Sequence, residues 1–74
     1  LGRADSRIIL TLVEMLRDPK EKVRSSASRA LGQLGDANDR VIVGLANSLR
    51  DPNGNVRSSA AWALGQLGRA DGHI

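Results

Sequence analysis

Residues 16–35 read LRDPKEKVRSSASRALGQLG, and residues 49–68 read LRDPNGNVRSSAAWALGQLG. The offset between the two stretches is 33 residues, and five of their 20 aligned positions differ, so 15 are identical. The repetition extends beyond these stretches, because residues 1–5 and residues 67–71 both read LGRAD. Self-similarity with a period of about 20 to 50 residues is typical of solenoid proteins, whose stacked repeats present extended surfaces to partners. The sequence therefore predicts a repeat array.

The composition is that of a small helical unit with an aliphatic core. Apolar residues make up 41% of the 74-residue chain, but Trp62 is its only aromatic residue, so Leu, Ile, Val and Ala must fill the interior. The absence of cysteine excludes disulfides and thiolate metal sites, and it favours a cytoplasmic location. No run of about 18 apolar residues is present, so the sequence encodes no membrane span. The formal charge of +3 is spread over interleaved basic and acidic residues.

The first helical pattern of each repeat runs from Arg7 to Arg17 and again from Arg40 to Arg50. Its apolar residues recur at helical spacing, namely Ile8, Ile9, Leu12, Val13 and Leu16, matched by Val41, Ile42, Leu45, Ala46 and Leu49. The expected N-caps are Asp5 or Ser6 in the first copy and Asp39 in the second. An Asp-Pro pair at residues 18–19 and 51–52 ends each of these helices, because proline disfavours helical dihedrals in the residue before it.

The second helical pattern runs from Glu21 to Leu34 and again from Gly54 to Leu67. Its predicted buried stripe is Val23, Ala27, Ala30, Leu31 and Leu34, matched by Val56, Ala60, Ala63, Leu64 and Leu67. Asn53 is a good N-cap for the second copy, whereas Lys20 at the matching position of the first copy is not.

Glycines mark two further positions of the second helix. Gly35 and Gly68 follow the helical pattern where a left-handed C-cap is expected. Gly32 and Gly65 lie inside the helix, where each costs roughly 1 kcal/mol relative to Ala, so their recurrence predicts a close approach of another helix.

Two antiparallel helices joined by a short turn form an α-hairpin, and stacked hairpins form a superhelix. The predicted fold is therefore an all-α solenoid with about two repeats, residues 3–35 and 36–68, and with residues 69–74 as the start of a third. Because the chain begins and ends within the repeat frame, we interpret it as an excerpt of a longer array.

The pattern D-P-x-x-x-V-R-x-x-A-x-x-A-L-G-x-L-G resembles the short HEAT-like repeats of the phycobilisome-lyase type. The matching positions are Asp18, Pro19, Val23, Arg24, Ala27, Ala30, Leu31, Gly32, Leu34 and Gly35, and then Asp51, Pro52, Val56, Arg57, Ala60, Ala63, Leu64, Gly65, Leu67 and Gly68. The resemblance covers nearly the whole chain. It implies that the first helices form the convex face and that the second helices line a concave, partner-binding groove.

The expected groove consists of the second-helix positions that the buried stripe leaves over, namely Ser25, Ser26, Arg29, Gln33, Ser58, Ser59, Trp62 and Gln66. Trp62 replaces Arg29 of the first copy, and it is either a contact residue for a partner or a residue packed over the neighbouring helix. The resemblance also implies structural ion pairs around the turns, in which Arg24 and Arg57 each pair with Asp18 or Asp51, either within their own repeat or in the next one.

No catalytic, cofactor or metal site is predicted. The serine pairs have no neighbouring base, as nucleophilic catalysis requires, and the single histidine, His73, makes no metal site without cysteine. The carboxylates are scattered, with no paired arrangement for acid–base chemistry.

The leading functional hypothesis is a protein–protein interaction scaffold without enzymatic activity. The alternatives are a subunit or chaperone of a bilin (tetrapyrrole) lyase and an electrostatic nucleic-acid binder that uses the basic stretch from Arg17 to Arg29. We also expect self-association, because the first helix and the outer flank of the Trp62 helix carry surfaces on which a neighbouring repeat would pack.

Overall fold

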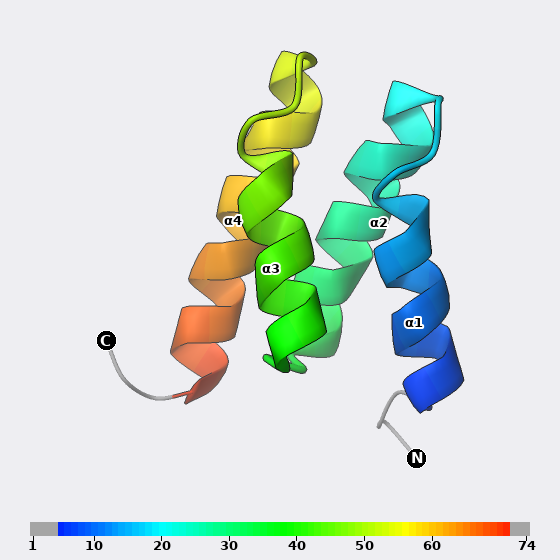
Figure 1. The fold of residues 1–74 in the computed structure, drawn as a ribbon. Coiled ribbons are helices and arrows are strands. Elements are labelled where there is room, and N and C mark those ends of the chain that lie inside the picture. The colour runs from blue at the N-terminus through cyan, green and yellow to red at the C-terminus, as the bar shows by residue number, and fades with distance from the viewer. Residues whose placement is uncertain (1–4, 72–74) are drawn as a thin grey trace.

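Four helices make up the computed structural model, which describes residues 5–71 and contains no strand in that range (Figure 1). The helices are α1 (Ser6–Met15), α2 (Glu21–Leu34), α3 (Asp39–Ser48) and α4 (Gly54–Asp71). Helices α1 and α2 form one antiparallel hairpin and α3 and α4 form a second, which lies beside the first. The predicted all-α architecture is confirmed.

The turn inside each hairpin has the same geometry in both copies. After α1, the Arg17 and Asp18 amides donate to carbonyls three residues back at 3.0 and 3.1 Å, and the Arg50 and Asp51 amides do the same after α3 at the same distances. Such bonds tighten the last helical turn and satisfy carbonyls that the helix leaves unpaired. The first helices are therefore shorter than predicted and end at Met15 and Ser48.

Side-chain caps begin three of the four helices. The Asp5 carboxylate accepts from the Arg7 amide at 2.8 Å, and Asn53 Oδ1 accepts from the Val56 amide at 3.2 Å, which confirms both as N-caps. The cap of α3 is Asn38, whose Oδ1 accepts from the Val41 amide at 3.0 Å, so the assignment to Asp39 is wrong by one residue. Lys20 makes no side-chain cap, as predicted.

The two predicted glycine caps behave differently. Gly35 ends α2 in the left-handed conformation with φ of 74°, and its amide donates to the Leu31 carbonyl. Gly68 is helical, and α4 continues to Asp71, so the prediction of a cap there is wrong. Gly68 is followed by Arg and Ala, which favour the helix, whereas Gly35 is followed by an Asp-Ala-Asn segment that caps α3.

A single aliphatic core joins all four helices. Its buried members are Ile9, Leu16, Ala27, Leu31, Val41, Leu45, Ala60, Ala63 and Leu67. The predicted stripe of α2 is wrong at Leu34, which is 40% exposed, and it omits Ser28 and Gly32, which are buried. Ser28 and Gly32 are buried because α2 contacts both α1 and α4, so that it buries two faces, and the face toward α4 consists of small residues.

Small residues bring α2 and α4 close together, with Ser25 beside Ser59 and Gly32 beside Ala63. A Cβ on Gly32 would lie 2.7 Å from Ala63 Cα and 2.8 Å from Ala63 Cβ, closer than real atoms approach, which confirms the close contact predicted at Gly32. At Gly65, no atom of a neighbouring element in the described chain lies within 4 Å of that position, so the prediction is wrong there. Gly65 faces outward because α4 is the last helix in the described stack.

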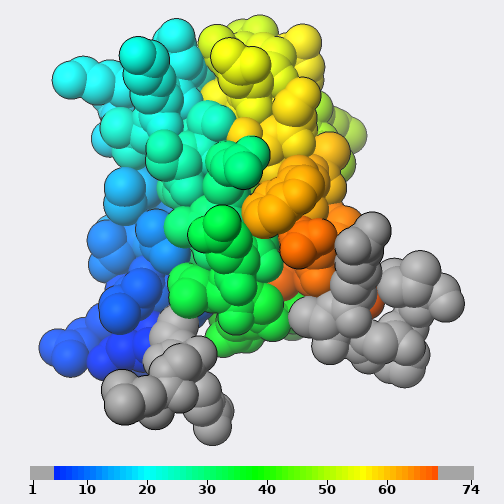
Figure 2. All heavy atoms as spheres, turned by 180° about the vertical axis from the view of Figure 1, so that it is seen from behind, coloured from blue at the N-terminus to red at the C-terminus, as the bar shows by residue number. Residues whose placement is uncertain are grey.

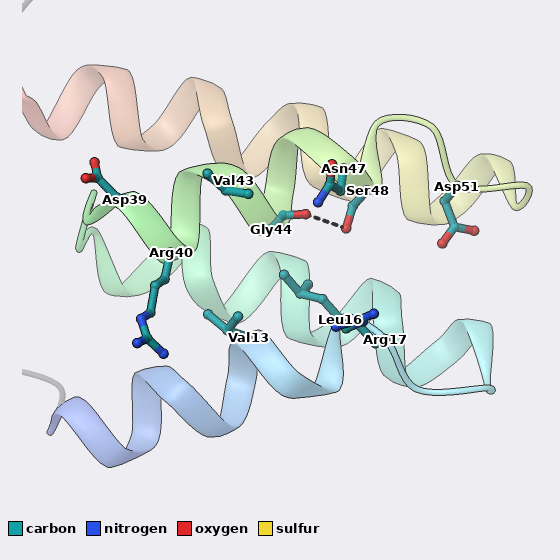
Figure 3. Close-up of a pocket in the computed structure, with 10 residues that line it drawn as sticks. All are labelled: Val13, Leu16, Arg17, Asp39, Arg40, Val43, Gly44, Asn47, Ser48 and Asp51. Atoms are coloured by element: carbon teal, nitrogen blue, oxygen red, sulfur yellow. Dashed lines mark hydrogen bonds between the residues drawn. The ribbon is translucent and has the colours of Figure 1, made fainter.

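Helices α1 and α3 approach each other less closely than α2 and α4 do, so the stack is tighter on the α2–α4 side (Figure 1). A hollow of about 480 Å³ lies between α1 and α3 (Figure 3). Val13 and Leu16 line it from α1 and its cap, and Val43 and Gly44 line it from α3. None of the helices in the described range is both long enough and apolar enough to cross a membrane.

Candidate partner-binding groove

A groove of about 630 Å³ runs between α2 and α4 on the face shown in Figure 2. Its lining residues are Glu21, Lys22, Ser25, Ser26, Arg29, Asn55, Ser58, Ser59 and Trp62. The groove-lining residues of each helix recur at the 3- to 4-residue spacing that places side chains on one face, as Lys22, Ser26 and Arg29 do on α2. The walls are thus short and polar, with charged side chains from α2 and one aromatic ring from α4.

The structure brings six of the eight predicted groove residues into this lining and leaves out the two glutamines. Gln33 is exposed and Gln66 is half-buried, and both lie one helical turn beyond Arg29 and Trp62. Sequence reasoning missed Glu21, Lys22 and Asn55. The signal was available, because each lies four residues before a predicted groove serine on the same helix face.

Ser59, which the sequence predicts to be exposed in the groove, differs in the structure. Its side chain is buried, and its hydroxyl lies 2.7 Å from the hydroxyl of the half-buried Ser25, within hydrogen-bonding distance. The pair joins α2 to α4 at the floor of the groove. Ser25 and Ser59 therefore hold the two repeats together, while Ser26 and Ser58 are exposed to solvent.

Trp62 combines the two roles that the sequence left open. The Arg29 guanidinium carbon lies 5.0 Å from the centre of the indole ring, which is a cation–π distance. A Cβ on Gly32 would lie 3.0 Å from the ring edge, so the indole also packs against α2. Trp62 nevertheless stays 36% exposed. The ring is thus held in one orientation and still presents area to a partner.

An ion pair between the repeats fixes the relative position of the two hairpins. Arg24 Nε and Nη2 donate to the Asp51 carboxylate at 2.8 and 3.1 Å, and both side chains are largely buried. Arg24 Nη1 also donates to the Asp18 and Pro19 carbonyls at 2.8 and 3.0 Å. One guanidinium therefore links the turn of its own repeat to the turn of the next repeat.

The bond from Arg24 holds the pKa of Asp51 below its usual value of 3.8, with further help from the Asn53 amide and the nearby positive charge. The same bond raises the pKa of Arg24. Both shifts have the sign expected when a charged form is stabilised by its partner.

The remaining two residues of the expected ion pairs form other bonds. Arg57 Nη1 donates to the Asp51 backbone carbonyl at 2.6 Å, and no carboxylate pairs with Arg57 among the described side chains. The Asp18 carboxylate accepts from the Lys20 amide at 2.8 Å. Of the expected pairings, Arg24 forms the one that crosses to the next repeat, with Asp51, whereas Arg57 binds a backbone carbonyl instead of a carboxylate.

Among the described side chains, the hydrogen bond of the groove serines joins Ser25 to Ser59, and no carboxylate accepts from a groove serine. His73 lies outside the described residues, and within them no three potential metal ligands gather. The basic stretch that suggested nucleic-acid binding contains Arg24, whose guanidinium is held by Asp51.

Residues 9–72 match the family described as HEAT repeats. The match covers most of the chain, and the four helices with their repeated turns agree with it, so the chain belongs to the HEAT repeat family. HEAT repeats are α-hairpin units that generally act as scaffolds for protein–protein interaction. No curated protein matches the chain significantly.

Proposed function

We propose that this chain is a non-catalytic scaffold whose α2–α4 groove binds a protein partner. The observation that carries the proposal is that Trp62 presents a partly exposed indole, which Arg29 holds beside the polar part of the α2–α4 groove. A rigid aromatic side chain loses little entropy on binding, and such residues are enriched among interface residues that contribute most to affinity. The contact residues are the exposed members of the predicted set, Ser26, Arg29, Ser58 and Trp62, with Gln33 and Gln66 beyond them.

The groove suits an extended polypeptide segment. Its walls carry serine hydroxyls and an asparagine amide, which hydrogen-bond to backbone groups, and its charged residues are two cations and one carboxylate. A segment with an acidic side chain opposite Lys22 or Arg29 and an apolar side chain on Trp62 fits this arrangement.

A display library of random peptides selected on the immobilised chain tests the proposal. We expect enriched peptides to lose binding at least about tenfold on Trp62→Ala, since interface tryptophans often contribute 2 kcal/mol or more. The matched control is Val43→Ala, an exposed apolar truncation on α3, which leaves peptide binding unchanged. Peptides that respond to Val43→Ala and ignore Trp62→Ala would refute the groove.

Two other functions are alternatives to binding a protein partner. A subunit or chaperone of a bilin lyase of the phycobilisome type would bind a tetrapyrrole, visible as a shift of its absorption spectrum on titration with the chain. Nucleic-acid binding would weaken steeply with salt. The polar lining of the groove and the bonds that Arg24 makes to Asp51 favour the protein partner over both.

We propose in addition that the chain associates with itself through the outer faces of its two hairpins. Apolar side chains on these faces support the proposal, since Ile8 is 52% exposed and Leu49 is 41% exposed. Sedimentation across a concentration series measures the association, and a constant sedimentation coefficient would refute it.

A further inference from the structure

The contact between the two repeats shows how a third repeat would bind. Arg24, Ser25, Ser28 and Gly32 form the face of α2 that packs against the second hairpin, and all four are buried or half-buried. The residues 33 positions later are Arg57, Ser58, Ala61 and Gly65, which we call the outer face of α4. All four are exposed, and open space lies over Gly65. The same surface is thus covered in the first repeat, on α2, and uncovered in the second repeat, on α4.

The partner surface in that contact also occurs twice. Asp51, Ser59, Trp62 and Ala63 receive α2, and their equivalents 33 positions earlier are Asp18, Ser26, Arg29 and Ala30, which we call the receiving face of α2. Ser26 and Arg29 are exposed, and Asp18 and Ala30 are half-buried. Val23 is half-buried as well, whereas its equivalent Val56 is fully buried. The receiving face is therefore also accessible.

We propose that the outer face of α4 binds the receiving face of α2 on a second copy of this chain, head to tail. This inference rests on the self-association proposed above and specifies its geometry. Each contact of the internal interface has a counterpart: Arg57 with Asp18, Ser58 with Ser26, and Gly65 with Ala30 of the second copy.

The first repeat has Arg29 where the second repeat has Trp62, and this difference argues that a second copy of the chain binds the outer face of α4. Inside the chain, Arg29 of the first repeat lies over Trp62 of the second. In a head-to-tail contact, Trp62 of one copy meets Arg29 of the next, so the same cation–π pair forms with the order reversed. A repeat with Arg at both positions would place two like charges together.

The first helices, α1 and α3, are also compatible with a head-to-tail contact, except at one position where a larger residue replaces a glycine. Leu16 is 6% exposed because it packs toward Gly44, whereas its equivalent Leu49 is 41% exposed and would be covered in the stack. The second copy presents Thr11 where Gly44 stands. A Cβ at position 44 lies 2.8 Å from a terminal methyl of Leu16, so Leu49 must turn its flexible end aside to fit.

Sedimentation velocity of the 74-residue chain across a concentration series is the first measurement. We expect the mass to grow beyond a dimer, because a head-to-tail contact leaves a free face at each end. Gly65→Gln inserts a side chain into the contact and replaces Gly with a better helix former, so its helical circular dichroism stays that of the wild type. Its dissociation constant is expected to rise at least about tenfold, since the added side chain overpacks the contact.

Charge exchange identifies the partner residues. Arg57→Asp and Asp18→Arg each place like charges together in a homotypic contact, and each is expected to weaken association at least about tenfold. An equimolar mixture of the two variants restores association, because the two substituted side chains then meet as opposite charges. Arg40→Asp is the control, since it makes the same charge change on the side of α3 that faces α1 (Figure 3) and leaves association unchanged.

Three results would overturn the proposal. A wild-type chain that stays monomeric refutes self-association itself. Association that persists unchanged in folded Gly65→Gln and Arg57→Asp variants, or that stops at a closed dimer, refutes the head-to-tail contact and leaves self-association through another surface. Two charge variants that fold but fail to associate when mixed refute the pairing of Arg57 with Asp18. Ser26, Arg29 and Ser58 belong both to the groove and to this contact, but the results above measure association alone, and peptide binding is tested separately by Trp62→Ala.

Discussion

Gly32 and Gly65 occupy the same position of the repeat in opposite surroundings, which gives a matched pair of substitutions. Alanine improves helix propensity equally at both sites, by about 1 kcal/mol, so the difference between the variants isolates the contact with Ala63. That contact involves a backbone atom that no rotamer change can move, and overpacking typically costs about 1–3 kcal/mol. We therefore expect Gly32→Ala to be less stable than Gly65→Ala by about 1–3 kcal/mol in urea denaturation followed by circular dichroism. Equal stabilities would show that α2 and α4 are not closely packed at this point.

The carboxylate of Asp51 gives the fold a sensitivity to acid. Its pKa is lower in the folded chain than in the unfolded chain, because Arg24 donates to it, so its ionised form stabilises the fold. This contribution is complete above the unfolded pKa, about 3.9, and is lost as the pH falls through the lower folded value. The stability of the wild type should therefore decrease as the pH is lowered from about 5 to 2, and Asp51→Asn should decrease less.

Two other carboxylates matter for this measurement of stability against pH, one as a control and one as a second source of acid sensitivity. Asp36→Asn, in the exposed linker between the hairpins, is the control and should keep the wild-type dependence. Asp5 also has a lowered pKa, because the Arg7 amide donates to it, so Asp51→Asn retains part of the acid sensitivity. An unchanged slope in Asp51→Asn would show that the Arg24–Asp51 pair does not form in solution.

At the scale of the helix, the two second helices begin with the same backbone turn and different caps. The Lys20 and Asn53 amides each donate to the preceding aspartate at 2.8 Å, but only the asparagine side chain reaches first-turn amides of its helix. Asn53→Ala should destabilise the chain by about 1 kcal/mol, and Lys20→Asn should stabilise it by a similar amount. Thermal unfolding measures both. A neutral Lys20→Asn would mean that the α2 turn does not adopt the α4 geometry.

Sequence patterns located the helices well because their signals are local. The bounds of α2 agree at both ends, where a proline lies one residue before its N-cap and Gly35 follows its last turn. The end of α4 could not be read from Gly68, because a glycine permits the left-handed conformation without imposing it. Whether the helix stops depends on the residues that follow.

Burial was predictable only on the side that carries large apolar residues. The hydrophobic period identifies one face of α2, but Ser28 and Gly32 form a second buried face that has no hydrophobic signal. Ser28 tolerates burial because its hydroxyl donates to the Arg24 carbonyl one turn earlier, at 3.0 Å. Most groove positions followed from the helical period, whereas the burial of Ser59 depends on a contact across the repeats with Ser25.

For the molecule as a whole, the interface between the hairpins is part of the core. Leu31 is completely buried, in the one cluster to which all four helices contribute, so its truncation should affect both repeats together. Leu31→Ala is expected to cost about 2–5 kcal/mol. Trp62 fluorescence reports on the contact between α4 and α2, where the indole packs, and far-ultraviolet circular dichroism reports on all four helices. The two unfolding curves should shift by the same amount. Leu34→Ala makes the same truncation at a 40% exposed site and should cost clearly less. Unfolding curves that separate in the wild type would mean that the contact between the hairpins is lost before the helices unfold, against the single core that the packing of α2 on α4 implies.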